Sequence, residues 1–280
     1  MKLPPFDYAA PATLDEAVAL LASRDGAKAL SGGQSLIPTM AFRLATPSLL
    51  VDLRKIKGLN EIKIDPEFVR LGARVRWRDI EDSKELKTAH PLLVAAISHV
   101  AHYQIRNRGT VGGSLAHADP AAEMPGIAIT CDAQIQVQGK KGSRVIAAKD
   151  FFTGALSTAL ADDELIVEVR LPAWKPNRRW GFQELSPRRG DFAFAGVAAY
   201  YDLDASGKAQ NTHIGVIGAC TQPHRIPAAE AVLNGRVVNE QSLREAAAAA
   251  EKAVQPPQDL HASSEYRRSL VGTLLERALT

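Results

Sequence analysis

Apolar and polar positions first form a clear pattern at residues 13–23, where apolar residues recur at helical spacing. Thr13 and Glu16 have the spacing of a capping box that opens a helix, and Gly26 follows where a helix commonly ends. The apolar face consists of Leu14, Ala17, Val18 and Leu21. We therefore expect an amphipathic helix that packs against a sheet.

Short apolar runs at residues 27–30 and 49–53 predict strands of that sheet, with a helical turn at 40–44 between them. This β-α-β unit would end near Gly58. Farther on, alternation between residues 62 and 75 predicts strands, and a largely apolar run predicts a helix at 90–101.

A further helix is predicted at residues 120–131, with Asp119 as its N-cap and Pro120 at its first position. Glu123 would then lie in the first turns. Three alternating segments follow, and they predict an antiparallel meander over residues 134–138, 144–148 and 165–171.

Residues 172–179, rich in Pro, Lys, Arg and Asn, have the composition of a linker between domains. The pattern then predicts strands at 180–185, 192–203 and 212–219, and helices at 227–233, 240–254 and 264–279. We expect an α+β protein with two domains. Residues 1–175 would form the first, with subdomains 1–58 and 59–175, and residues 176–280 would form a three-stranded antiparallel sheet with a helical bundle.

Two glycine pairs stand out, Gly32-Gly33 and Gly112-Gly113, and each follows a predicted strand and is followed by a serine. Without Cβ atoms, the backbone N–H groups of such loops can approach an anion closely. One pair alone is ordinarily a plain turn. The two together indicate a site for an anion such as a diphosphate.

Composition is that of an ordinary soluble globular protein, with 46% hydrophobic residues and a net charge of +3 from 34 basic and 31 acidic residues. The basic residues are scattered, so we expect no binding of nucleic acid. No apolar run reaches the roughly 18 residues of a membrane span, and the first residues lack the apolar stretch of a secretory signal. We therefore expect a cytoplasmic protein without a transmembrane segment.

Metal binding is not expected in this chain. Cys131 and Cys220 are isolated, which excludes a zinc or iron–sulfur site and favours small core residues. His99 and His102 have a ligand-like spacing, but no third donor accompanies them. Redox work in this chain would need an organic cofactor. The motifs of P-loop, Rossmann, zinc protease and serine hydrolase enzymes are missing.

Three segments carry a family resemblance: Ser-Gly-Gly-Gln-Ser-Leu-Ile-Pro from residue 31, residues 104–125, and Arg-Arg-Gly-Asp-Phe-Ala from residue 188. They closely resemble the FAD-binding medium subunit of bacterial molybdenum hydroxylases, a family that includes carbon monoxide, N-heterocycle and, more distantly, xanthine dehydrogenases. The resemblance covers essentially the whole chain. It implies a two-lobed FAD-binding domain of the PCMH (vanillyl-alcohol-oxidase-like) type, followed by a small domain of antiparallel sheet and helices.

The resemblance also implies a flavin site. The backbones of residues 31–35 and 110–114 would hold the diphosphate and adjoining sugar, Glu123 would contact the ribityl hydroxyls, and the Phe192 ring would cover one face of the flavin. Phe192 could equally be a core residue, and Lys28 is either a solvated strand residue or a cation near the diphosphate. The full set is Lys28, Leu30, Ser31, Gly32, Gly33, Gln34, Ser35, Leu36, Val100, Ala101, Thr110, Val111, Gly112, Gly113, Ser114, Ala118, Asp119, Glu123, Leu160, Asp191 and Phe192.

In mechanism, the resemblance implies an oxidoreductase subunit without catalytic residues of its own. A large partner would oxidise the substrate at a molybdenum cofactor, and a small partner would pass electrons through [2Fe–2S] clusters to FAD, which would release them to an external acceptor. A dimer of heterotrimers is implied. Two alternatives stay open: a stand-alone FAD-dependent alcohol oxidase of the same fold, and a scaffold subunit that has lost its flavin.

One departure from the family is visible. Many relatives carry Lys two residues after an aromatic residue, near the flavin ring, whereas Glu184 here follows Phe182. A cation there would stabilise a reduced, anionic flavin. Glu184 would therefore either lower the flavin potential or point to solvent.

Overall fold

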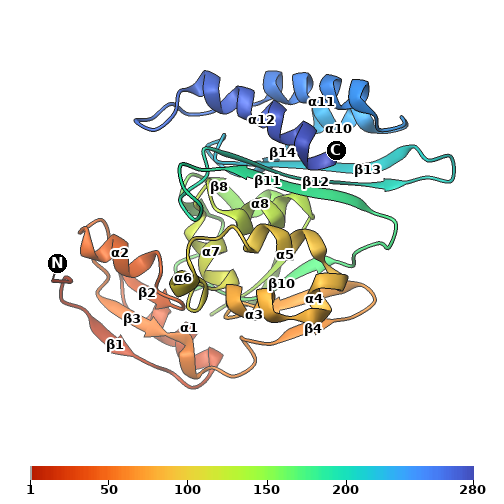
Figure 1. Ribbon diagram of the computed structural model, residues 1–280. Coiled ribbons are helices and arrows are strands. Elements are labelled where there is room, and N and C mark those ends of the chain that lie inside the picture. Colours follow the sequence, from red (N-terminus) through yellow and green to blue (C-terminus); the bar gives the residue numbers. More distant parts are fainter. Residues whose placement is uncertain (1) are drawn as a thin grey trace.

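The first lobe of the protein is a small parallel sheet covered by helices. A computed structural model describes residues 2–280, and Figure 1 shows this lobe at one end of the molecule. Its sheet has the order β1-β3-β2, and all its pairs are parallel. The elements are β1 (Asp7–Ala9), α1 (Leu14–Ala22), β2 (Ala27–Leu30), α2 (Leu36–Ala41), β3 (Leu49–Asp52) and a 3-10 turn (Leu53–Lys55).

Two predictions for this lobe have clear outcomes. The capping box of Thr13 and Glu16 is confirmed, and Ala17, Val18 and Leu21 are the buried residues of α1. The helical turn expected at 40–44 is wrong in position, because α2 begins at Leu36 and ends at Ala41. The helix thus starts directly after the first glycine pair.

The second lobe contains a five-stranded antiparallel sheet of order β4-β5-β10-β6-β7. Its strands are β4 (Ile62–Ile64), β5 (Phe68–Gly72), β6 (Gln134–Gly139), β7 (Gly142–Ala147) and β10 (Leu165–Pro172), and β8 (Phe152–Gly154) pairs separately with β9 (Ser157–Thr158). The predicted meander is wrong, because β10 lies between β5 and β6. β7 is left at the edge, where most of its residues are exposed.

Helices cover this sheet. They are α3 (Trp77–Asp82), α4 (Lys84–Ala89), α5 (Pro91–Ile97), α6 (Tyr103–Arg106), α7 (Val111–His117), α8 (Glu123–Thr130) and α9 (Ala148–Phe151). The helix expected at 90–101 ends at Ile97. The helix expected from Pro120 begins only at Glu123, because Asp119 accepts a hydrogen bond from the backbone of Ala121 and makes a turn before it.

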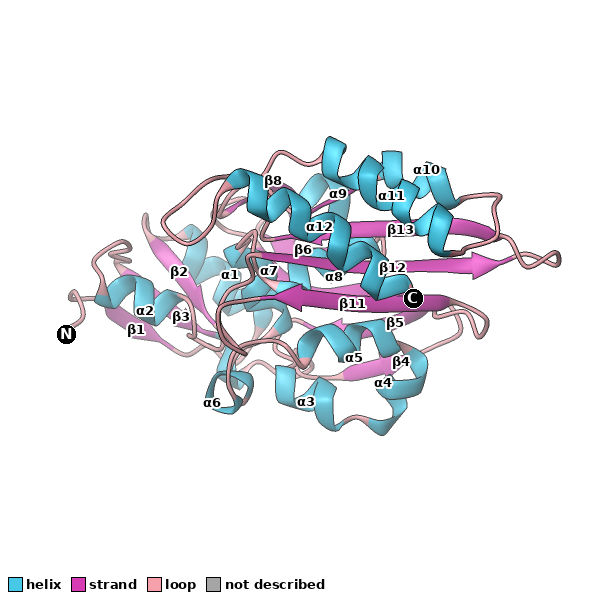
Figure 2. Cartoon of the chain, turned by 45° about the horizontal axis from the view of Figure 1, so that its top comes forward, coloured by secondary structure: helices cyan, strands magenta, loops and turns pink. Residues whose placement is uncertain are grey.

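The C-terminal part is a four-stranded antiparallel sheet with helices on one face (Figures 1 and 2). Its elements are β11 (Arg179–Leu185), β12 (Ala195–Leu203), β13 (Ala209–Ile217), β14 (His224–Arg225), α10 (Pro227–Leu233), α11 (Glu240–Ala253) and α12 (Ser264–Leu279). The expectation of three strands is wrong, because the sheet has a fourth, short strand, β14, which pairs with Gly215 and Val216 of β13. The three predicted helices are present.

The other face of this sheet packs on the second lobe. Phe182, Ala198, Tyr200 and Ile217 belong to the same hydrophobic cluster as the buried residues of α5, α8 and the five-stranded sheet. A second cluster lies between the sheet and the three C-terminal helices, and a third fills the first lobe. The sheet is therefore buried on both faces, and β12 is buried along most of its length.

Candidate functional site

The first glycine stretch forms a loop with unused backbone donors. It runs from β2 into α2, and Gly33 turns the chain with a φ of +75°. Within residues 2–280, the backbone N–H groups of Gly32, Gly33, Gln34 and Ser35 donate no hydrogen bond, and no side chain caps α2. Since buried or half-buried N–H groups normally have partners, this loop is suited to hold an anion.

The second stretch lies directly beside the first. The hydroxyl oxygens of Ser31 and Thr110 are 3.0 Å apart, and a Cβ atom at Gly32 would overlap the carbonyl oxygen of Arg108. The two glycine segments, nearly 80 residues apart in sequence, therefore do meet, and glycine is required for the approach.

The secondary structure expected for the second stretch is wrong. Thr110 is the N-cap of α7, so Gly112 and Gly113 lie inside a helix and not in a loop after a strand. Their N–H groups already have partners, the carbonyl of Ala73 for Gly112 at 2.8 Å and the hydroxyl of Thr110 for Gly113 at 3.3 Å. A Cβ at Gly112 would clash with Ala73, so this glycine serves helix packing.

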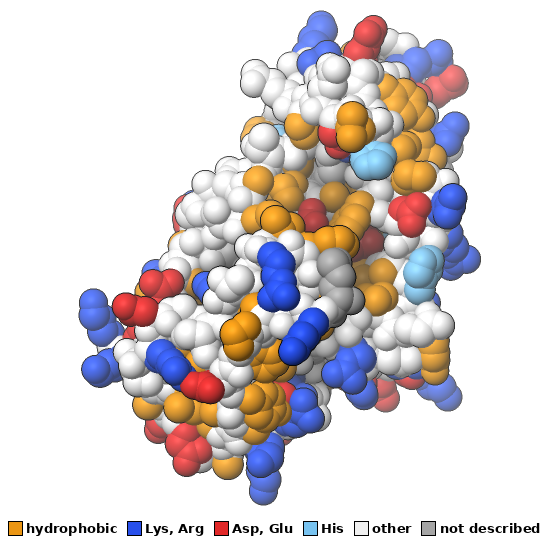
Figure 3. Space-filling view, turned by 90° about the vertical axis from the view of Figure 1, so that its left-hand side faces the viewer, with side chains coloured by type: hydrophobic (Ala, Val, Ile, Leu, Met, Phe, Trp, Pro, Cys, Tyr) orange, Lys and Arg blue, Asp and Glu red, His pale blue; other side chains and the backbone are white. Residues whose placement is uncertain are grey.

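The surface of the molecule is hollowed at one end. Figure 3 looks onto the end of the molecule that carries the first lobe and shows a depression with apolar and acidic side chains in it. Glu123, the first residue of α8, is only 9% exposed, and no other residue in 2–280 donates a hydrogen bond to its carboxylate. Burial, together with the charge of Asp119, raises the pKa of Glu123 to about 7.

The Val100–Ala101 segment is held firmly in an unusual conformation. Arg106 donates hydrogen bonds to both carbonyl oxygens at 2.9 Å and forms an ion pair with Glu81. Ala101 has a φ of +40°, which is rare for a residue with a side chain. This role of Arg106 was not predicted, because the sequence does not show which carbonyl groups a half-buried arginine will contact.

The loop after β11 brings Asp191 and Phe192 to the same place. A Cβ at Gly190 would lie 2.7 Å from the carbonyl oxygen of Ala101, so this loop touches the Val100–Ala101 segment. Phe192 is 70% exposed, and the reading of it as a core residue is wrong. An exposed ring beside a hollow is free to cover a planar ligand.

The remaining predicted residues are less distinctive. Lys28 is exposed, whereas Leu30, Leu36 and Leu160 are half-buried. Ala118 is buried with a left-handed backbone, and its carbonyl accepts a hydrogen bond from Leu156. Leu160 packs against the main core, so the geometry does not distinguish a ligand contact from a core residue there.

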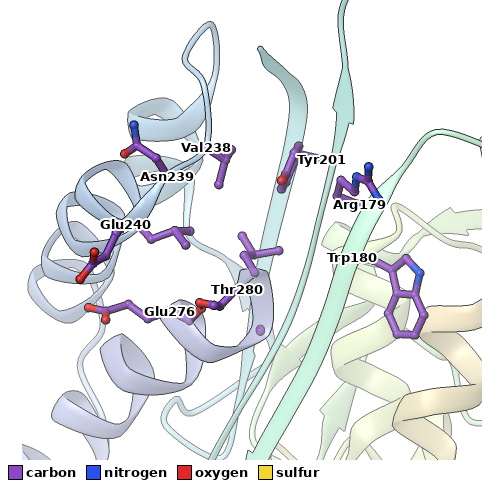
Figure 4. A pocket seen from close by; sticks show the side chains of 11 residues that line it. Arg179, Trp180, Tyr201, Val238, Asn239, Glu240, Glu276 and Thr280 are labelled. Atoms are coloured by element: carbon purple, nitrogen blue, oxygen red, sulfur yellow. The ribbon is translucent and has the colours of Figure 1, made fainter. Parts of the chain in front are cut away.

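A separate pocket of about 480 Å³ lies on the C-terminal sheet, far from these residues (Figure 4). Arg179, Trp180 and Tyr201 line it on the sheet side, and Glu240 and Glu276 on the helix side. None of the predicted site residues lines it. Within residues 2–280 no three acidic, histidine or cysteine side chains form a metal-binding group, and no helix has the length and apolar character needed to cross a membrane.

Comparison with known proteins shows to which family this chain belongs. Residues 4–174 match the family model described as the FAD-binding domain in molybdopterin dehydrogenase, and residues 180–280 match the CO dehydrogenase flavoprotein C-terminal domain. The chain belongs to the family of FAD-binding medium subunits of molybdenum hydroxylases. It is thus a subunit of an oxidoreductase, its cofactor is FAD, and family members work in complexes with a large and a small subunit.

Relatives in this family cover the whole chain. The nicotine 6-hydroxylase medium subunit of Paenarthrobacter nicotinovorans is 40% identical over 100% of this chain and 98% of its own length. The carbon monoxide dehydrogenase medium chain of Hydrogenophaga pseudoflava is 34% identical over 99% of this chain and 96% of its own.

Solved structures of the family have the same fold. Carbon monoxide dehydrogenase from Hydrogenophaga pseudoflava superposes with a TM-score of 0.96 at 35% identity, covering 100% of this chain and 97% of the other. Quinoline 2-oxidoreductase from Pseudomonas putida 86 superposes with a TM-score of 0.95 at 36% identity, and it covers the same shares of the two chains. The expected fold class, α+β with an FAD-binding domain followed by a sheet-and-helix domain, is confirmed.

Proposed function

We propose that FAD lies in the hollow between the two lobes and that this subunit transfers electrons between a small partner's [2Fe–2S] clusters and an external acceptor. The observation that carries the proposal is the loop at residues 32–35, whose N–H groups donate no hydrogen bond within residues 2–280. A diphosphate satisfies such donors, whereas an empty loop would leave them unpaired.

The other segments would serve the rest of the cofactor. Residues 110–114 lie beside the loop and would bound the diphosphate and sugar, with the hydroxyls of Ser31 and Thr110 between them. Glu123 would accept hydrogen bonds from ribityl hydroxyls, because no other residue in 2–280 donates to its buried carboxylate. Phe192 would cover one face of the flavin ring, and the Val100–Ala101 segment, fixed by Arg106, would form part of the wall.

FAD supplies two-electron chemistry when it is bound. The chain's own residues bind it, orient it and limit water, and none of them needs to act as acid or base on the organic substrate. We assign the substrate chemistry to the large partner, the delivery of electrons to the small one, and the assembly to a dimer of heterotrimers. Residues 1–175 would form the cofactor-binding domain, and the complex would work in the cytoplasm.

The test is to purify the full chain with its partners from its own host and to record the visible spectrum, metal content and native mass. Flavin, iron and molybdenum together in a complex of three kinds of subunit are expected. A lone yellow protein that oxidises alcohols would favour the stand-alone oxidase, and a colourless protein would contradict FAD binding.

A further inference from the structure

Glu184 is half-buried, has one fully buried carboxyl oxygen, and lies on the strand that leads into the Asp191–Phe192 loop. It lies on β11, two residues after Phe182, so both side chains lie on the same face of the strand, toward the second lobe. The Phe182 ring is 5.0 Å from the imidazole of His99, which directly precedes the Val100–Ala101 segment. After β11 the chain continues into the loop that carries Asp191 and Phe192. β11 therefore joins two of the proposed flavin-binding segments, the Val100–Ala101 segment through the Phe182–His99 contact and the Asp191–Phe192 loop through the chain itself.

No positive charge compensates this carboxyl group. The Oε2 atom of Glu184 is fully buried and has no hydrogen-bond partner in residues 2–280, and neither Glu184 nor Glu123 forms an ion pair there. The charged group that acts on Glu184 is Glu123, on helix α8, which packs against the neighbouring strands β12 and β13. Asp119 adds a further negative charge near Glu123.

Histidine does not change this balance. Burial and the charge of Arg189 lower the pKa of His99, so its imidazole is neutral. Burial, followed by the charge of Glu123, raises the pKa of Glu184 to about 8. Two carboxyl groups in such surroundings cannot both ionise cheaply, so the ionisation of one opposes the ionisation of the other.

We infer that Glu184 is the residue through which the flavin site takes up and releases a proton as the charge of the flavin changes. The inference rests on the proposed placement of FAD in the hollow. When two electrons enter the flavin, the carboxylate of the Glu123–Glu184 pair forms one O–H bond with a proton from solvent. The electrons stay on the flavin, and reoxidation breaks the same O–H bond and returns the proton to solvent.

The direction of the pH effect follows from charge. A reduced flavin that carries more negative charge raises the pKa of the pair further, so reduction and proton uptake favour each other. Over the pH range in which the carboxyl pair takes up a proton, one proton is added per two electrons. The reduction potential then falls by about 30 mV per pH unit more than it would without that proton. Without the Glu184 carboxyl group that additional slope becomes smaller, because only Glu123 is left to take up the proton.

The test measures the flavin reduction potential of the FAD-loaded full chain between about pH 6 and about pH 9, where the pair changes its protonation. Glu184→Gln keeps the shape of the protonated side chain and removes the charge. Its potential should match the wild type at low pH, lie higher at high pH, and fall less steeply. The control is Glu67→Gln, which removes an equal charge from the exposed turn between β4 and β5. The same slope in wild type and Glu184→Gln would overturn the inference.

A second measurement does not depend on flavin. In the flavin-free full chain, the infrared carbonyl band of a protonated carboxyl group should be present at neutral pH, disappear at high pH, and be weakened by Glu184→Gln. An unchanged band would overturn the inference. If the chain binds no FAD at all, the proposed function fails, while the infrared result still decides whether the carboxyl pair holds a proton.

Discussion

At the scale of single residues, Gly33 combines a left-handed backbone with unpartnered donors, and both properties belong to the loop proposed for the diphosphate. Gly33→Val introduces backbone strain and also blocks the approach, so we expect flavin-deficient protein. Gly207→Val is the matched control, because Gly207 has a similar φ of +78° in a turn with nothing within 4 Å. Both variants should lose about 1 kcal/mol of stability or more. Full flavin occupancy in Gly33→Val, read from the absorbance of purified protein, would contradict the loop assignment.

Phe192 offers a second test at this scale, because its ring is exposed in the chain alone. Phe192→Ala should weaken FAD binding by about 1 kcal/mol, roughly fivefold, through loss of an aromatic contact. It should leave the free energy of unfolding within about 0.5 kcal/mol of the wild type. Phe42→Ala is the control, since Phe42 is equally exposed at 68% after α2. Titration of the flavin-free chain with FAD separates the two variants, and equal affinities would refute the role of Phe192.

The sequence predicted the role of a residue where the backbone there needs glycine. Gly32 and Gly33 were identified because glycine permits close approach, and the Ser31–Thr110 contact joins the two segments. Gly112 was interpreted the same way, but its missing Cβ serves packing against Ala73. The sequence of a Gly-Gly pair does not distinguish these uses. The burial of the Glu184 carboxyl oxygen was also out of reach, because it depends on the second lobe packing against the C-terminal sheet.

At the scale of elements, α12 packs on β11 through one contact that only glycine permits. A Cβ at Gly181 would overlap the carbonyl oxygen of Ala278. Gly181→Ala should therefore force the helix away from the sheet and cost about 2–4 kcal/mol of unfolding free energy. Gly154→Ala is the control, because a Cβ there meets only Ser157 at 3.8 Å, an ordinary contact. Chemical denaturation measures both, and equal stability would show that the helix yields without cost.

Elements with strong local signals were predictable, and those defined by distant partners were not. The three C-terminal helices have clear apolar faces, and Pro227, Asn239 and Ser263 open them locally. The place of β10 in the sheet depends on pairing with β5, almost 100 residues earlier, and no local pattern records that. For the same reason the two-residue β14 was not expected.

At the scale of the whole molecule, the predicted linker is bound to the C-terminal sheet by a buried ion cluster. Asp202 accepts hydrogen bonds from Lys175 at 2.9 Å and from Arg178 at 2.8 Å. The Arg178 guanidinium also lies 4.0 Å from the centre of the Tyr200 ring. A linker between domains was predicted from composition. These contacts fix the segment to the C-terminal sheet, and a shared hydrophobic cluster packs the two parts together.

Acid should weaken the contacts of Asp202 with Arg178 and Lys175 over a defined pH range. Burial opposes ionisation of Asp202, but the hydrogen bonds from Arg178, Lys175 and Asn211 outweigh it and lower the pKa to about 2. A lowered pKa contributes stability above the unfolded value near 4, and this contribution is lost as pH falls toward about 2.

Asp202→Asn should therefore cost about 3 kcal/mol at neutral pH, because Arg178 would stay buried without a counterion, and the difference from wild type should shrink toward pH 2. The control is Asp162→Asn at an exposed site. Thermal unfolding as a function of pH measures the difference, and a pH-independent gap would contradict the assignment.

The central position of β10 also bears on how the protein is made. β10 ends at Pro172 and separates β5 from β6 in the sheet, so these two strands have no partner between them until that part of the chain has been synthesised. On the ribosome, about the first 170 residues leave the exit tunnel with this gap open and with apolar strand edges uncovered. The nascent subunit is therefore expected to depend on chaperones up to the moment β10 emerges, and to close its sheet in a single late step.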